Sequence, residues 1–180
     1  MLRRSFVAGA AASILPGLAA AAPVGLPVAP DLLGAVRSLQ GATEGSGGAT
    51  IHVMFTPWCH VSPEIWKNTR SLRGVSIRWL PFSGGQPEGR EAVDRFLQNP
   101  SASAVPRIFT RLQPLAMMPP TPLSDMQDDR IERLAPIVIR DTGRNLVAPT
   151  IVYTIGPDRV RVVPGGISSA DFLEIARYAA

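Results

Sequence analysis

The fold of this chain is decided by the stretch Ile51-His52-Val53-Met54-Phe55-Thr56-Pro57-Trp58-Cys59-His60-Val61-Ser62. Its first five residues form a compact apolar run, which predicts a buried β-strand. The residues that follow, 62–72, have apolar positions at helical spacing, and Pro63 suits a first helical turn. Cys59, the only cysteine of the 180 residues, lies between the predicted strand and the predicted helix. An internal disulfide is therefore excluded, and the thiol is free, capped or paired with another molecule.

A cysteine between a strand and a helix has a physical reason to be reactive. The first N–H groups of a helix lack internal partners and the helix dipole is positive there, so both stabilise a thiolate. His60 adds to this effect if its ring is protonated or donates a hydrogen bond, and a solvated surface histidine is the alternative. For Cys59 itself the alternative is a buried, inert thiol.

The first 22 residues have the pattern of a signal peptide. Arg3 and Arg4 form a basic start, an Ala-rich apolar run covers 6–20, and small residues near Ala21 suit a signal peptidase. The run is short for a membrane span of about 20 residues, and an uncleaved anchor is the alternative. The arginine pair also resembles a twin-arginine signal. We expect a periplasmic protein with no membrane span in the mature chain, and the export route stays open.

Composition excludes several classes of function. Removal of the signal segment leaves about 158 residues, enough for one domain, and lowers the formal net charge from +4 to +2. The basic residues are scattered, so no nucleic-acid partner is expected. The sequence contains no P-loop, dinucleotide fingerprint, nucleophile elbow or zinc-ligand spacing, so we expect no cofactor and no metal.

Copper is the alternative that the soft ligands leave open. Thiolate and thioether groups suit Cu(I), and the chain has Cys59, His60, Met54 and the pair Met117-Met118. Their spacing is not that of a recognised copper site. Methionine beside proline more often fills space in a core than it binds metal.

The rest of the chain predicts an α/β fold. Residues 23–49 read as a linker with one short helix, because Gly41–Gly48 is glycine-rich, and an ordered domain is expected over 50–180. Residues 99–123 are rich in proline and predict an irregular or loosely helical insertion. The order of the predicted strands and helices along the chain predicts a three-layer sandwich with a mixed central sheet. The further strands are expected over 75–82, 150–155 and 159–163, and the further helices over 88–98, from Ser124 with a bend at Pro136, and after Gly166.

This order of elements resembles the thioredoxin superfamily, and it is similar to the catalytic domain of periplasmic disulfide isomerases of the DsbC and DsbG type. The resemblance covers about residues 50 to 178. It implies that Cys59 is the nucleophile and that Pro149 is the cis-proline, although trans is the default for any one proline of the eighteen. It also implies that Trp58, Ala148 and Thr150 lie beside the substrate. It rests on Phe55-Thr56-Pro57-Trp58-Cys59-His60, Ile77-Arg78-Trp79-Leu80-Pro81-Phe82, Ala148-Pro149-Thr150-Ile151-Val152 and Pro164-Gly165-Gly166.

One departure from that family sets the chemistry that we expect. Ser62 stands where the second, resolving cysteine would be, so no internal thiol can release a mixed disulfide from Cys59. Our first hypothesis is monothiol, isomerase-like thiol–disulfide exchange in the envelope, with Cys59, Ser62 and His60 at the catalytic site. Its partners would be proteins with cysteines or disulfides and an external redox partner. The second hypothesis is a redox-inactive thioredoxin-fold binding module of an envelope or secretion assembly.

Overall fold

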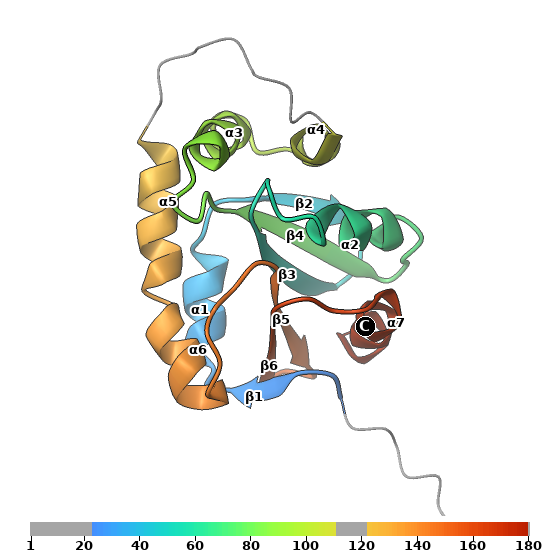
Figure 1. Cartoon of the computed structure of the whole chain (residues 1–180). Coiled ribbons are helices and arrows are strands. Elements are labelled where there is room, and N and C mark those ends of the chain that lie inside the picture. The colour runs from blue at the N-terminus through green and yellow to red at the C-terminus, as the bar shows by residue number, and fades with distance from the viewer. Residues whose placement is uncertain (1–22, 111–121, 180) are drawn as a thin grey trace, which may run out of the picture.

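The structure is a computed structural model that describes residues 23–110 and 122–179. Its centre is a six-stranded sheet in the order β1-β6-β5-β3-β4-β2, with helices on both faces (Figure 1). The predicted α/β sandwich with a mixed sheet is confirmed. The strands are β1 (Leu26–Val28), β2 (Ala42–Gly45), β3 (Ala49–Phe55), β4 (Val75–Pro81), β5 (Thr150–Ile155) and β6 (Arg159–Pro164). The helices are α1 (Asp31–Arg37), α2 (Ser62–Thr69), α3 (Pro87–Gln98), α4 (Ala104–Thr110), α5 (Leu123–Glu132), α6 (Ala135–Thr142) and α7 (Ser169–Ala179).

The sheet combines one parallel pair with antiparallel neighbours. β3 and β4 run parallel and α2 makes the crossover between them, whereas β5 is antiparallel to β3. β5 and β6 form the predicted hairpin. Its turn passes through Gly156, whose φ of +63° lies in the left-handed region that glycine adopts without strain. β1 and β2 add antiparallel strands at the two edges.

Two apolar clusters fill the space on either side of the sheet. Successive side chains of a strand point to opposite faces, so Val53 and Phe55 pack with α2, α3, α4 and α7, whereas Met54 packs with α1, α5 and α6. Phe55, the last residue of β3, meets the ring of Trp79 edge to face with centroids 5.7 Å apart. This packing fixes the end of the strand from which the Cys59 segment leaves.

The N-terminal segment differs from its prediction. The short helix is present as α1 and buries Leu32, Leu33 and Val36, but residues 23–49 also supply β1 and β2 to the same sheet instead of a linker. The glycine-rich segment Gly41–Gly48 includes β2, whose pairing with β4 uses backbone groups. Strands of three or four residues are too short to produce an alternating pattern, which is why the sequence did not reveal them.

Three other predictions concern the helix from Ser124, the insertion over 99–123 and the signal peptide. The helix predicted from Ser124 is two helices, α5 and α6, with Pro136 in the first turn of α6 instead of at a bend. The expected insertion contains α4, while its residues 111–121 lie outside the described residues. The predicted signal peptide, 1–22, also lies outside them. Within 23–110 and 122–179, no helix has the length and apolar character needed to cross a membrane.

Candidate active site

Cys59 lies in a turn between β3 and α2. Its backbone N–H donates to the carbonyl oxygen of Thr56 (3.1 Å), and α2 begins at Ser62. The side chain is 7% exposed. Its thiol donates a hydrogen bond to the carbonyl oxygen of Ala148, with Sγ and O 3.7 Å apart. The thiol therefore faces a loop that is 89 residues further along the chain.

That loop contains a cis peptide bond between Ala148 and Pro149. The cis-proline implied by the family resemblance is confirmed, and the trans default is wrong here. The Gly165 N–H donates to the Pro149 carbonyl (2.9 Å), and the Thr150 hydroxyl donates to the Val147 carbonyl (2.6 Å). Both bonds tie the loop to the hairpin, so the Ala148 carbonyl is held beside the thiol.

Trp58 is the exposed neighbour of the thiol. Half of its side chain is exposed (50%), and its indole N–H donates to the Ser83 carbonyl (2.9 Å). The indole lies close to two glycines: a Cβ on Gly84 would lie 3.1 Å from Trp58 Cζ2, and one on Gly89 would lie 3.3 Å from Cδ1. The segment after β4 and the first turn of α3 therefore form the surface on which the indole rests.

A carboxylate of α5 holds the segment that binds Trp58. Asp128 accepts hydrogen bonds from the Ser83 N–H (2.8 Å), from the Ser83 hydroxyl and from the Gly85 N–H (3.4 Å). Sequence analysis missed Ser83 and Asp128. They lie 45 residues apart, and neither belongs to a recognisable motif, so only the folded chain brings them together.

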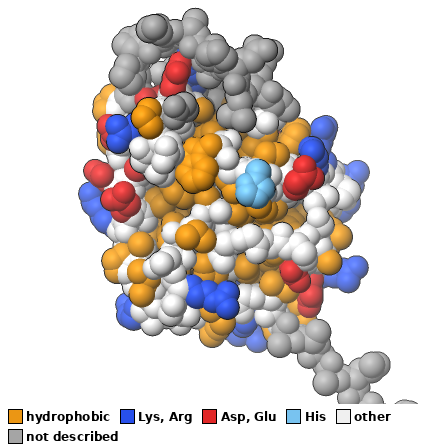
Figure 2. All heavy atoms as spheres, viewed as in Figure 1, with side chains coloured by type: hydrophobic (Ala, Val, Ile, Leu, Met, Phe, Trp, Pro, Cys, Tyr) orange, Lys and Arg blue, Asp and Glu red, His pale blue; other side chains and the backbone are white. Residues whose placement is uncertain are grey.

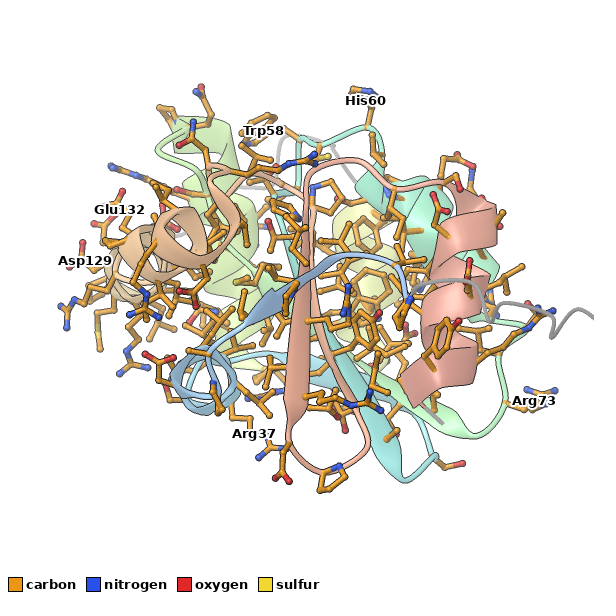
Figure 3. The ribbon with its side chains drawn as sticks, turned by 90° about the horizontal axis from the view of Figure 1, so that it is seen from below. Arg37, Trp58, His60, Arg73, Asp129 and Glu132 are labelled. Atoms are coloured by element: carbon orange, nitrogen blue, oxygen red, sulfur yellow. The ribbon has the colours of Figure 1, made fainter. Side chains whose placement is uncertain are left out.

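Ser62 and His60 differ sharply in their surroundings. Ser62 is fully buried, and its hydroxyl has no hydrogen-bond partner among the described residues. His60 is exposed, and Figure 3 shows it with Trp58 at one end of the molecule, projecting from the surface. Its ring forms no hydrogen bond or ion pair with the part of the chain that the structure describes. The structure therefore fits the solvated-histidine alternative.

The residues of the copper alternative are spread over different surroundings. Met54 is fully buried in the apolar cluster beneath α1, and Met117 and Met118 lie outside the described residues. Residues 23–110 and 122–179 hold no group of three or more His, Cys, Asp or Glu side chains arranged for a metal ion. Met54 is therefore a core residue.

Comparison with known proteins identifies the fold. No protein-family model and no curated protein matches the chain. Among solved structures it is similar to a periplasmic thioredoxin-like protein from Salmonella enterica serovar Typhimurium (9% identity, TM-score 0.56, covering 83% of this chain and 96% of the other). It is also similar to a disulfide interchange protein from Neisseria gonorrhoeae (15%, 0.52, 76% and 93%) and to BcfH from Salmonella enterica Typhimurium (10%, 0.51, 83% and 78%). The chain has a thioredoxin-like fold, as the sequence resemblance predicted.

Proposed function

We propose that this chain catalyses monothiol, isomerase-like thiol–disulfide exchange in the periplasm, with Cys59 as the nucleophile. The observation that carries the proposal is the 3.7 Å contact between Cys59 Sγ and the carbonyl oxygen of Ala148, directly before the cis-Pro149. The thiol and the cis-proline loop meet at this contact, and the half-exposed indole of Trp58 belongs to the residue directly before Cys59. Solved structures with the same fold include a disulfide interchange protein and a periplasmic thioredoxin-like protein.

The exchange needs one thiolate in the protein. Cys59 loses its proton to solvent, and its sulfur attacks one sulfur of a substrate disulfide. A mixed disulfide forms, and the second substrate sulfur leaves as a thiolate. Another substrate thiolate, present from the start or freed when the leaving thiolate attacks a second substrate disulfide, then attacks the substrate sulfur of the mixed disulfide and releases Cys59. The substrate ends with a different pairing and no net change in oxidation state, so the isomerisation consumes no oxidant or reductant.

The surroundings of Cys59 indicate which substrates fit. The side chains of Trp58 and Val147 are exposed and hydrophobic, and they belong to the two segments that meet at the thiol. Figure 2 shows hydrophobic side chains spread across the middle of this face of the molecule, with a histidine among them and charged groups mostly around the margin. We propose that the substrates are exported proteins with apolar residues beside their cysteines. Where no other substrate thiolate reaches the mixed disulfide, an external thiol would attack it, release Cys59 and itself become disulfide-bonded to the substrate.

One observation favours a second candidate function. Cys59 is 7% exposed, and its thiol must give up the bond to the Ala148 carbonyl before it can react. A thioredoxin-fold module that binds partners without redox chemistry could keep such a thiol as a core residue. This module would serve an envelope or secretion assembly and would not need Cys59.

Trapping distinguishes the two candidates. The reduced protein is mixed with a protein substrate whose disulfides have been scrambled, quenched with acid and analysed by mass spectrometry. Exchange predicts an accumulating adduct on Cys59 and recovery of the native disulfides, and both disappear in Cys59→Ser. The alkylation rate of Cys59 against pH, with the unfolded chain as control, measures access to the thiolate. A wild-type protein that forms no adduct, while Cys59→Ser keeps every binding partner, would show the module instead.

A further inference from the structure

A concave feature lies at the opposite end of the sheet from Cys59. It is a pocket of about 300 Å³ beneath the end of α1. Residues Thr50 and His52 line it from the beginning of β3, whereas Cys59 follows the end of that strand. Figure 3 shows Arg37, another lining residue, at the opposite end of the molecule from Trp58 and His60. The pocket is therefore separate from the candidate active site.

The strand register builds the floor of this pocket. Thr43 of β2 pairs with Arg78 of β4, and Arg78 pairs with His52 of β3, so the three residues form one row across the sheet. Thr154 of β5 also lines the pocket. Side chains at paired positions of neighbouring strands lie on the same face, which brings these polar groups together under α1.

Two charged side chains line the pocket, those of Arg37 and Arg78, and both are cationic. The Arg78 guanidinium donates to the carbonyl oxygens of Arg37 (2.8 Å) and Leu39 (2.5 Å), which holds it against the end of α1. These bonds engage two of its five N–H donors and leave its positive charge in place. The Arg37 side chain lines the same pocket. Within the described residues, neither guanidinium has a carboxylate at ion-pair distance.

The remaining polar groups of the pocket have unpaired atoms as far as residues 23–110 and 122–179 show. His52 is 3% exposed, and its Nδ1 has no hydrogen bond to any described residue. Burial, together with the charges of Arg78 and Arg37, lowers the His52 pKa from 6.5 to about 4, so the ring is neutral at pH 7. The hydroxyl groups of Thr43, Thr50 and Thr154 form no side-chain hydrogen bond with the described residues. The positive charges of Arg78 and Arg37, which disfavour a protonated His52, would favour a bound anion.

From this arrangement we propose that the pocket binds a small oxyanion that carries a phosphate or carboxylate group. Guanidinium groups present paired N–H donors that match the oxygens of such groups, and the threonine hydroxyls supply further donors. The volume leaves room for an organic anion as well as for the oxyanion itself. The site is independent of the proposed exchange reaction, because none of its residues belongs to the Cys59 site.

The two histidines of the chain make the site measurable by NMR. The Cε1–H signal of His52 is assigned with the variant His60→Gln. The full chain is then titrated at pH 7 with inorganic phosphate and, separately, with citrate, against sodium chloride of equal ionic strength. We expect a saturable shift of the His52 signal with at least one of the two oxyanions and none with chloride. Phosphate alone or citrate alone would identify the preferred group.

Two arginine variants test the assignment of the pocket. Arg37→Gln removes one guanidinium and keeps the carbonyl that Arg78 uses, so the protein should fold and its oxyanion affinity should fall by about tenfold. Arg73→Gln removes the same charge from a residue that Figure 3 places elsewhere, and Cys59→Ser removes the thiol; both should keep the wild-type affinity. Thr154→Val provides a second pocket variant with nearly the same volume. The proposal is overturned if neither oxyanion produces a saturable shift, or if Arg37→Gln and Thr154→Val both bind like the wild type.

Discussion

The two ends of β3 are built in different ways. At the Cys59 end, backbone geometry makes the site: a turn after the strand, a cis peptide bond and a carbonyl 3.7 Å from the sulfur. At the His52 end, side chains from several elements make the pocket, and the register of β2, β4 and β3 aligns them. The backbone site leaves two short contiguous motifs in the sequence, around Cys59 and around Pro149, whereas the side-chain site leaves residues that are individually ordinary.

The largest effect on reactivity is expected at the Cys59 end, from Ser62→Cys. The Ser62 hydroxyl is buried and makes no bond with the described residues, so a thiol there loses no hydrogen bond, and cysteine is itself among the most buried residue types. The new thiolate would attack Cys59 in a mixed disulfide, release the substrate thiol and form a disulfide within the chain. With about 0.1 mM external thiol present, release of the adduct should accelerate at least about tenfold, because a short tether gives an effective concentration of about 1 mM.

The lifetime of the trapped adduct, followed by mass spectrometry, measures this effect. Ser62→Ala is the matched control, because it removes the hydroxyl without adding a thiol and should leave the lifetime unchanged. An equal lifetime in Ser62→Cys and Ser62→Ala would mean that the two positions do not react with each other. The turn after β3 would then not bring the side chains of residues 59 and 62 within reach of each other.

The next effect is expected at the His52 end, in the dependence of stability on pH. Burial and the charges of Arg78 and Arg37 lower the His52 pKa to about 4 in the folded state, against the ordinary histidine value of 6.5 in the unfolded state. Above pH 6.5 the ring is neutral in both states. As the pH falls towards 4, the unfolded state takes up the proton first, so the folded state loses about 3 kcal/mol of stability.

Urea unfolding at pH 7 and at pH 4 measures this loss in the wild type and in His52→Gln. Carboxylates also titrate in this range, so the quantity of interest is the difference between the two proteins. The variant should lose about 3 kcal/mol less than the wild type on acidification, and His60→Gln, exposed at the other end, should behave like the wild type. Parallel pH profiles for His52→Gln and the wild type would mean that the ring is not held neutral in the pocket.

The same contrast explains how much the sequence could predict. The β3–Cys59–α2 segment and the β5–β6 hairpin carry local patterns, and both were predicted correctly. β1 and β2 are stabilised by backbone pairing at the edges of the sheet, which three or four residues do not encode in a pattern. The pocket around His52 has no such pattern, because the row that pairs His52 with Arg78 exists only in the folded sheet, and the Nδ1 of His52 is unpaired among the described residues.

A smaller effect on stability than that of His52 is expected from Asp128→Ala, which tests whether backbone geometry alone makes the Cys59 end. The carboxylate accepts bonds from the Ser83 N–H and hydroxyl and from the Gly85 N–H, and the Ser83 carbonyl in turn accepts the Trp58 indole N–H. Removal of the carboxylate should cost about 2 kcal/mol in the free energy of unfolding, because the donors lose a charged acceptor in a partly buried place.

A purely structural role for Asp128 would change stability without affecting Trp58, so the indole is the decisive readout. In Asp128→Ala the Trp58 indole proton should exchange with solvent faster than in the wild type. The indoles of Trp66 and Trp79 both donate to Glu44, at 3.5 Å and 2.8 Å, and serve as internal controls that should not change. Faster exchange confined to Trp58 would mean that a side chain of α5 positions the residue beside the thiol. Unchanged exchange at Trp58 would mean that Gly84, Gly89 and the backbone hold the indole without it.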